Sequence, residues 1–156
     1  MYHRRTLIAG AAAAVLCSAL PATAQQATTD TLEISGGFAR ATPPMARVGA
    51  GFLTIRSLGP ADRLVGFSTP ACNRPELHTH IAEGDVMQMR RIEAIEVPAG
   101  GVARLEPGGA HLMMIDLNAP LEEGGTVALT LVFETAGEVP VEVPVLGIGA
   151  MGPGEG

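Results

Sequence analysis

Histidine and methionine residues cluster in the middle of the chain, at spacings that suit a shared site. Three of the four histidines and four of the seven methionines lie between residues 78 and 114. Several are two positions apart in segments typical of strands, where side chains two apart point to the same face of a sheet. The pattern therefore predicts that imidazole rings and thioethers meet on one side of a sheet. The pairs are His78 with His80, Met87 with Met89, and His111 with Met113.

Imidazole nitrogens and thioether sulfurs without a carboxylate have a definite metal preference. Thioethers are soft, uncharged ligands that bind Cu(I) well and zinc, magnesium or calcium poorly. This donor set therefore favours Cu(I). Methionine is also a common core residue. The alternative is that all four methionines face the interior and the histidines are merely exposed, but the joint clustering at strand spacing favours the site.

The elements that must position these side chains are short strands. Alternating or β-branched runs, broken by Gly, Pro, Asn and Asp about every eight to twelve residues, predict an all-β sandwich or barrel. The turn Glu83-Gly84-Asp85 should pair its flanking strands as a hairpin, and Pro107-Gly108-Gly109 should deliver His111 to a loop edge. The run 126–133 suits a central strand. The predicted strands are 32–34, 49–56, 63–68, 75–81, 85–90, 94–97, 102–105, 111–117, 126–133 and 138–145.

The spacing of four of these residues resembles a known motif. The periplasmic PCu(A)C copper chaperones carry a histidine, ten residues, a methionine, 21 residues, a histidine, one residue and a methionine. His78, Met89, His111 and Met113 stand at these positions. The resemblance covers about residues 31–146, and its matched context includes the segments 39–44, 76–80, 86–90, 97–101, 105–113 and 120–124.

This resemblance implies a fold and a function. The fold would be a cupredoxin-like Greek-key β-barrel that binds Cu(I) outside the cytoplasm through His78, Met89, His111 and Met113. The protein would be a metallochaperone and not an enzyme. It would pass copper towards the binuclear copper site of a respiratory cytochrome oxidase, alone or with a Sco-type thiol protein.

The N-terminus is typical of an export signal. Arg4 and Arg5 precede an apolar stretch that ends in the small-residue cleavage site Ala22-Thr23-Ala24. The residues after the arginines match a twin-arginine signal only partly, which favours general secretion. We therefore expect a periplasmic protein. Its predicted segments are a signal peptide at 1–24 cleaved after Ala24, a flexible leader at 25–30, a copper-binding β-domain at 31–146 and a flexible Gly-rich tail at 147–156.

Charge and hydropathy exclude two classes of partner. The chain has 10 basic residues, all arginine, against 16 acidic ones, for a formal charge of −6. Such a chain offers no basic surface for nucleic acid. Beyond the signal, no apolar run approaches the roughly 20 residues that a membrane-spanning helix needs, so we expect no permanent membrane span.

The same residues allow other interpretations. A blue-copper site needs a cysteine thiolate, but Cys72 lies six residues before His78 and is better explained as a small buried residue. A hydrolase is disfavoured because no Gly-x-Ser-x-Gly elbow occurs and no histidine has an acidic residue at an informative spacing. His80 is either an extra or transient ligand or, as we favour, an exposed histidine, and Met151 in the tail receives no metal role. The remaining alternative is a non-metal immunoglobulin-like binding module, which would take up no copper.

Overall fold

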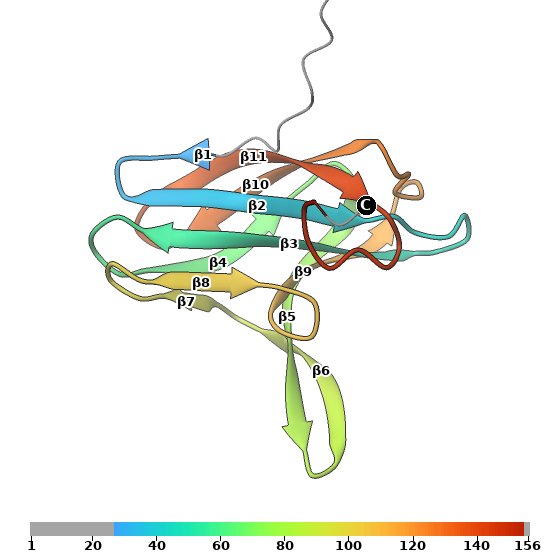
Figure 1. Cartoon of the computed structure of the whole chain (residues 1–156), viewed down its shortest axis with the longest axis horizontal. Coiled ribbons are helices and arrows are strands. Elements are labelled where there is room, and N and C mark those ends of the chain that lie inside the picture. The colour runs from blue at the N-terminus through green and yellow to red at the C-terminus, as the bar shows by residue number, and fades with distance from the viewer. Residues whose placement is uncertain (1–26, 155–156) are drawn as a thin grey trace, which may run out of the picture.

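The chain folds into a β-sandwich whose regular elements are all strands, so the predicted all-β class is confirmed (Figure 1). The structure is a computed structural model and describes residues 27–154. The strands are β1 (Ala27–Thr28), β2 (Leu32–Arg40), β3 (Val48–Ser57), β4 (Asp62–Ser68), β5 (Cys72–Glu83), β6 (Val86–Ile92), β7 (Ile95–Val97), β8 (Val102–Leu105), β9 (His111–Leu117), β10 (Thr126–Phe133) and β11 (Gly137–Leu146).

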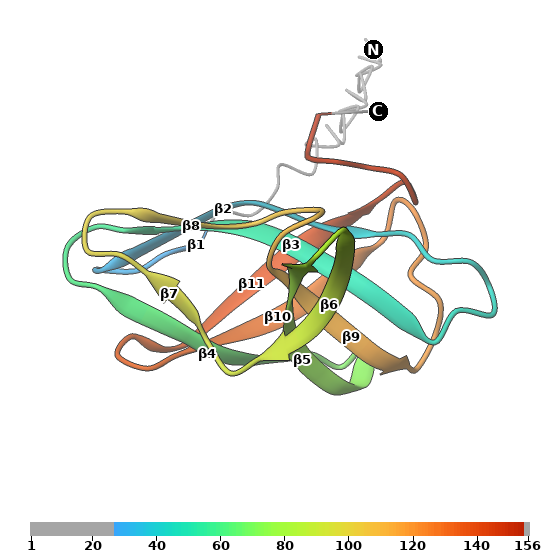
Figure 2. The same ribbon diagram turned by 90° about the horizontal axis from the view of Figure 1, so that it is seen from below.

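The strands form one continuous sheet that folds over on itself. Their order is β6-β5-β9-β3-β2-β11-β10-β4-β7, with β1 paired to β2 and β8 paired to β3. Figure 2 shows the two layers edge-on, with β2 and β8 above β4 and β10. The layers join where the ends of β2 and β11 pair in parallel, at Ala39 with Val145. The neighbours that are distant in sequence are the crossovers of a cupredoxin-like Greek-key fold.

The core lies between the layers and follows from the two-residue period of the strands. Inward positions of β10 and β11 are buried, from Val127 to Phe133 and from Val139 to Val145. β10 lies between β11 and β4, in the central position that the sequence predicts. On β9, Leu112 and Met114 are fully buried in this core. The side chain of Met113, which lies between them, must therefore point to the opposite face.

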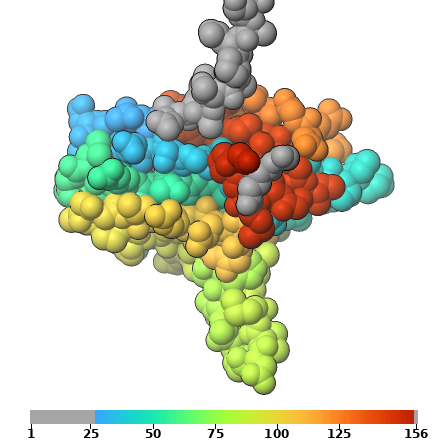
Figure 3. Space-filling view, viewed as in Figure 1, coloured from blue at the N-terminus to red at the C-terminus, as the bar shows by residue number. Residues whose placement is uncertain are grey.

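β5 and β6 form a hairpin that projects from the sandwich (Figures 1 and 3). Its turn is Gly84-Asp85, flanked by the pair Glu83 and Val86, as the sequence predicts. Gly84 has a φ of 65°, a left-handed conformation that glycine adopts without strain. β6 is the outermost strand of its layer. The base of this hairpin lies beside β9 and carries two of the clustered histidines.

The sheet differs from the prediction at β2 and β1, and each difference has a physical reason. The first strand was predicted at 32–34 but extends to Arg40, because Gly36 and Gly37 form a bulge in its pairing with β3 and not a turn. β1 was not predicted at all. It falls in the polar segment 25–30. Its two residues pair with β2, and a strand of two residues is too short to show an alternating side-chain pattern.

Two further expectations concern the ends of the chain. The predicted signal peptide and its cleavage site after Ala24 lie outside the described residues. In the tail, the backbone oxygen of Ala150 accepts a hydrogen bond of 2.7 Å from Nε of Arg40. Within residues 27–154, the structure has no helix with the length and apolar character needed to cross a membrane.

Candidate metal centre

The loop between β8 and β9 is anchored to one strand at both of its ends. β8 pairs with β3 up to Leu105, opposite Leu53, and β9 resumes pairing with the same edge at Leu112, opposite Gly51. The intervening residues 106–110 therefore bulge out of the sheet. The loop is closed by hydrogen bonds between Glu106 and Ala110 and between Gly109 and Glu106. This fold places the backbone oxygen of Gly109 beside the start of β9.

Three imidazole rings converge at this point from two adjacent strands. His78 on β5 lies directly opposite His111 on β9, with ring centroids 6.0 Å apart. His80, two residues further along β5, lies closer, with its ring centroid 5.4 Å from that of His111. All three side chains lie on the face of the sheet that points away from the main core. The strand spacing predicted from the sequence thus brings these rings together.

Hydrogen bonds define which ring nitrogens are free to bind a metal. Nδ1 of His111 lies 3.0 Å, and Nδ1 of His80 3.3 Å, from the oxygen of Gly109. A carbonyl oxygen only accepts, so both Nδ1 atoms are the donors and each Nε2 keeps its lone pair. In His78 the roles are reversed, because Nε2 donates to Oε2 of Glu76 at 2.8 Å. Nδ1 of His78 is buried and has no hydrogen-bond partner.

The methionines complete the cluster from either side. Met89 on β6 lies opposite His80 and is half-exposed, whereas Met113 on β9 lies between Ala50 on β3 and Glu76 on β5. A surface pocket of about 240 Å³ opens here. Its lining residues are Arg40, Ala50, Phe52, His80, Met89, Pro107, Gly108, His111 and Met113.

The four predicted ligands occupy this one region, although not in equivalent positions. Met89, His111 and Met113 line the pocket. His78 does not line it, and lies next to His111 on the more buried side, with 13% of its side chain exposed. His80, which the sequence favoured as merely exposed, is partly buried and lines the pocket itself.

Phe52 lines the pocket beside His111 and belongs to a small aromatic cluster. Phe52 packs against Phe38 with centroids 5.0 Å apart and lies 6.1 Å from the ring of His111. Both phenylalanines are buried but lie outside the main core cluster. The guanidinium of Arg40 stacks over Phe52, 5.4 Å from its centroid. This small second cluster keeps water away from one side of His111.

The environment of His111 favours its neutral, metal-binding form. Burial lowers the pKa of His111 below its usual 6.5, and the two neighbouring histidines act in the same direction, while the hydrogen bond to Gly109 opposes them. The pKa of Glu76 is also lowered, mainly by its hydrogen bond to His78. Glu76 is therefore ionised and accepts the hydrogen bond from Nε2 of His78.

Sequence reasoning missed several residues that shape the site. It identified no acidic partner for a histidine, yet Glu76 stands two positions before His78 on the same strand face, a spacing that could have revealed it. Arg40 and Gly109 had no such signal. The pairing of β2 with β3 brings Arg40 to the site, and the loop at residues 106–110 brings Gly109 there.

The remaining sulfur-containing residues of this region take other positions. Cys72 is buried in the main core, six residues from His78 along β5, and burial raises the pKa of its thiol. Its predicted role as a small buried residue is confirmed. Met114 is also in the core, whereas Met87 lies exposed near the hairpin tip, outside the pocket.

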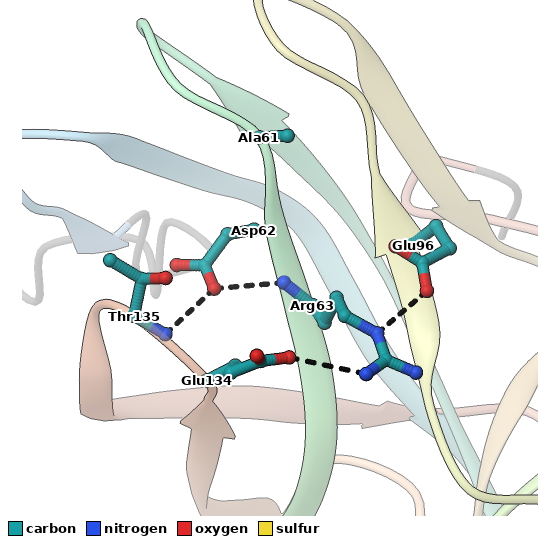
Figure 4. Close-up of a pocket in the computed structure, with 6 residues that line it drawn as sticks. All are labelled: Ala61, Asp62, Arg63, Glu96, Glu134 and Thr135. Atoms are coloured by element: carbon teal, nitrogen blue, oxygen red, sulfur yellow. Dashed lines mark hydrogen bonds and ion pairs between the residues drawn. The ribbon is translucent and has the colours of Figure 1, made fainter.

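A second polar pocket, of about 190 Å³, lies where β4 begins (Figure 4). The carboxylate of Asp62 is buried and accepts hydrogen bonds from the backbone amides of Arg63, Thr135 and Ala136 at 2.8 to 2.9 Å. Burial acts to raise the pKa of Asp62, but these hydrogen bonds outweigh it and the pKa falls below 3.8. Arg63 bridges Glu96 and Glu134 beside it.

Within residues 27–154, no three His, Cys, Asp or Glu side chains form a group that could hold a metal ion.

Comparison with known proteins shows the relationships of the chain. Residues 32–145 match the family described as "Putative lipoprotein LpqE-like". The "Putative lipoprotein Lxx21020" of Leifsonia xyli is 31% identical over 130 residues, covering 81% of this chain and 77% of that protein.

Solved structures show the same fold. The "apo PmoF2 PCuAC domain" is 26% identical with a TM-score of 0.67, covering 81% of this chain and 98% of that one. "CuI-DR1885" from Deinococcus radiodurans is 31% identical with a TM-score of 0.58, covering 80% and 81%. The chain therefore belongs to the LpqE-like family and has the fold of a PCu(A)C domain, as its histidine and methionine spacing predicts.

Proposed function

We propose that the protein is a copper chaperone that binds Cu(I) through His78, Met89, His111 and Met113. The similarity to a Deinococcus radiodurans protein solved with Cu(I) supports this proposal. The site itself supports it further, because it offers two imidazole lone pairs and two thioethers and no thiolate. Soft neutral ligands of this kind stabilise Cu(I) and bind harder divalent ions weakly.

The observation that carries the proposal is the unpartnered Nδ1 of His78. This nitrogen is buried beside His111 with its lone pair unused. Leaving a buried polar atom without a partner costs about 1 to 3 kcal/mol. A copper ion bound between the two rings would supply the missing partner. The hydrogen bonds to Glu76 and Gly109 already hold both rings in the tautomers that binding requires.

The proposal also covers the delivery of copper to a recipient protein. Met89 is 47% exposed, so one side of the ion would be within reach of an incoming ligand of a partner protein. Thiolates bind Cu(I) more strongly than thioethers, which gives transfer a direction. We assign the recipient as the binuclear copper site of a respiratory cytochrome oxidase, reached directly or through a Sco-type thiol protein. No catalytic step is assigned to the chain.

Export is part of the same proposal. The Leifsonia relative is named a lipoprotein, which fits an exported family. We assign this chain to the periplasm, with its signal peptide cleaved after Ala24. Mass spectrometry of the protein purified from the periplasmic fraction would test this, since it should begin at Gln25.

Anaerobic Cu(I) loading followed by X-ray absorption tests the ligand assignment. The wild-type protein should bind one Cu(I) with two sulfur and two nitrogen neighbours. Met89→Leu and Met113→Leu preserve volume, and each should remove one sulfur neighbour. The controls are Met114→Leu, which changes the buried neighbour of Met113, and Met45→Leu, on an exposed loop. Both controls should bind as the wild type does. A wild-type protein that takes up no copper would instead favour the non-metal binding module.

A further inference from the structure

The site contains one more imidazole than the proposed ligand set uses. His80 lines the pocket together with Met89, His111 and Met113, whereas His78 lies on the buried side of His111. The ring of His80 is also the nearer of the two to His111, at 5.4 Å against 6.0 Å between centroids. His80 is therefore the imidazole that lies nearer to His111, although it is not among the proposed ligands.

The Nε2 atom of His80 is free to bind a metal. Its Nδ1 faces the oxygen of Gly109, the same atom that fixes the tautomer of His111. Each of these two rings therefore presents Nε2 with its lone pair. Met89 lies directly opposite His80 in the register of the hairpin. His80, Met89 and His111 thus form a second set of donors on the solvent side of the pocket.

The two donor sets overlap but are not a single set. Residues two apart on a strand are separated by roughly 6.6 Å along it, and His78 and His80 accordingly flank His111 from two positions, His78 on the buried side and His80 in the pocket. In the described part of the chain, the three histidines do not form a joint metal-binding group. His78 and His80 are therefore alternative partners of His111.

We propose that His80 is the exchange ligand of this site, an inference that rests on the proposed function. Cu(I) is held at rest by His78 and passes to His80 when it enters or leaves, while His111 and the methionines keep contact with the ion. One copper–nitrogen bond forms as the other breaks. The oxidation state of copper does not change, and no proton moves, because both nitrogens already carry lone pairs.

Transfer of Cu(I) to a chromophoric chelator, followed by stopped-flow absorbance, tests this inference. His80→Asn should keep the Cu(I) affinity within about threefold of wild type but slow transfer by about tenfold, because the outer position is lost. His78→Asn should lower the affinity by about 100-fold, because the resting ligand is lost. Thr79→Ala, between them on the strand, is the control and should change neither quantity.

Each other outcome overturns the inference. Transfer from His80→Asn at the wild-type rate would leave His80 without an exchange role. An affinity loss as large as that of His78→Asn would make the two residues joint ligands. Thermal melting of the copper-free variants checks that each is folded. A wild-type protein that binds no Cu(I) would fail the proposed function itself, a result distinct from the first two.

Discussion

Two of the pockets in the described part of the chain have similar sizes and differ in how their polar atoms are used. The pocket at Asp62 has a volume of about 190 Å³ and the pocket at His111 about 240 Å³. Both oxygens of Asp62 accept backbone hydrogen bonds, and Arg63 is paired with two carboxylates. At the histidines, hydrogen bonds occupy one nitrogen of each ring and leave the other free.

We infer that this difference separates a structural cluster from the proposed copper site. Asp62 ties the start of β4 to the turn that joins β10 and β11, and its acceptors are used within the fold. The pocket at His111 is instead lined by imidazoles and thioethers, and each imidazole keeps one ring nitrogen without an internal hydrogen bond. Pocket volume does not distinguish the two regions. The presence of unused lone pairs does, and the following variants test that distinction.

The largest effect is expected at His111, the ring shared by both donor sets. His111→Asn should weaken Cu(I) binding by about 100-fold or more, which corresponds to about 2.7 kcal/mol. Competition with a Cu(I) chelator measures the affinity. Asp62→Asn, in the other pocket, is the control and should bind copper normally. Equal binding by both variants would remove the functional contrast between the pockets.

The reverse result is expected for stability at Asp62. Asp62→Ala leaves three backbone amides without their acceptor and should lower the free energy of unfolding by about 2 kcal/mol. Urea unfolding of the copper-free protein measures this. Glu134→Gln, which removes only an exposed ion pair with Arg63, should cost less than about 0.5 kcal/mol. If the two variants unfold alike, the amide bonds of Asp62 are not what stabilises this region.

A smaller effect on copper is expected from Glu76, which positions His78. Glu76→Gln removes the charge that holds the ring by its Nε2 proton and should weaken Cu(I) binding by about tenfold. Glu83→Gln is a matched change further along β5, where the carboxylate pairs with Arg90. That control should leave the affinity unchanged. An unaffected Glu76→Gln variant would show that the strand alone orients His78.

The smallest effect is a pH dependence of stability at Asp62. The pKa of Asp62 is lowered on folding from 3.8, so the folded state favours the ionised carboxylate. The ionised carboxylate of Asp62 contributes to the free energy of unfolding above pH 3.8. This contribution is lost as the pH falls below 3.8 through the pKa of the folded state. The difference in unfolding free energy between wild type and Asp62→Asn should therefore shrink below pH 3.8. A difference that stays constant with pH would contradict the lowered pKa.

How much the sequence could predict depended on whether a feature is local. Turn residues and the two-residue period placed the hairpin turn at Gly84 and put His111 and Met113 on one face, because both signals lie within a few positions. The bulge at Gly36 was missed because two glycines interrupt the two-residue side-chain period that indicates a strand. The roles of His80 and Arg40 depend on register between strands that are distant in sequence. No local pattern encodes that register.

The anchored loop at residues 106–110 makes loop length a determinant of metal binding. Its two flanking strands occupy consecutive stretches of one β3 edge. A change of the loop that slipped β9 by one position would turn every side chain of β9 to the other face. Leu112 and Met114 would then face solvent, and the imidazole and thioether of His111 and Met113 would be driven into the hydrocarbon interior. A loop change that slips this register should therefore weaken Cu(I) binding even where His111 and Met113 are kept.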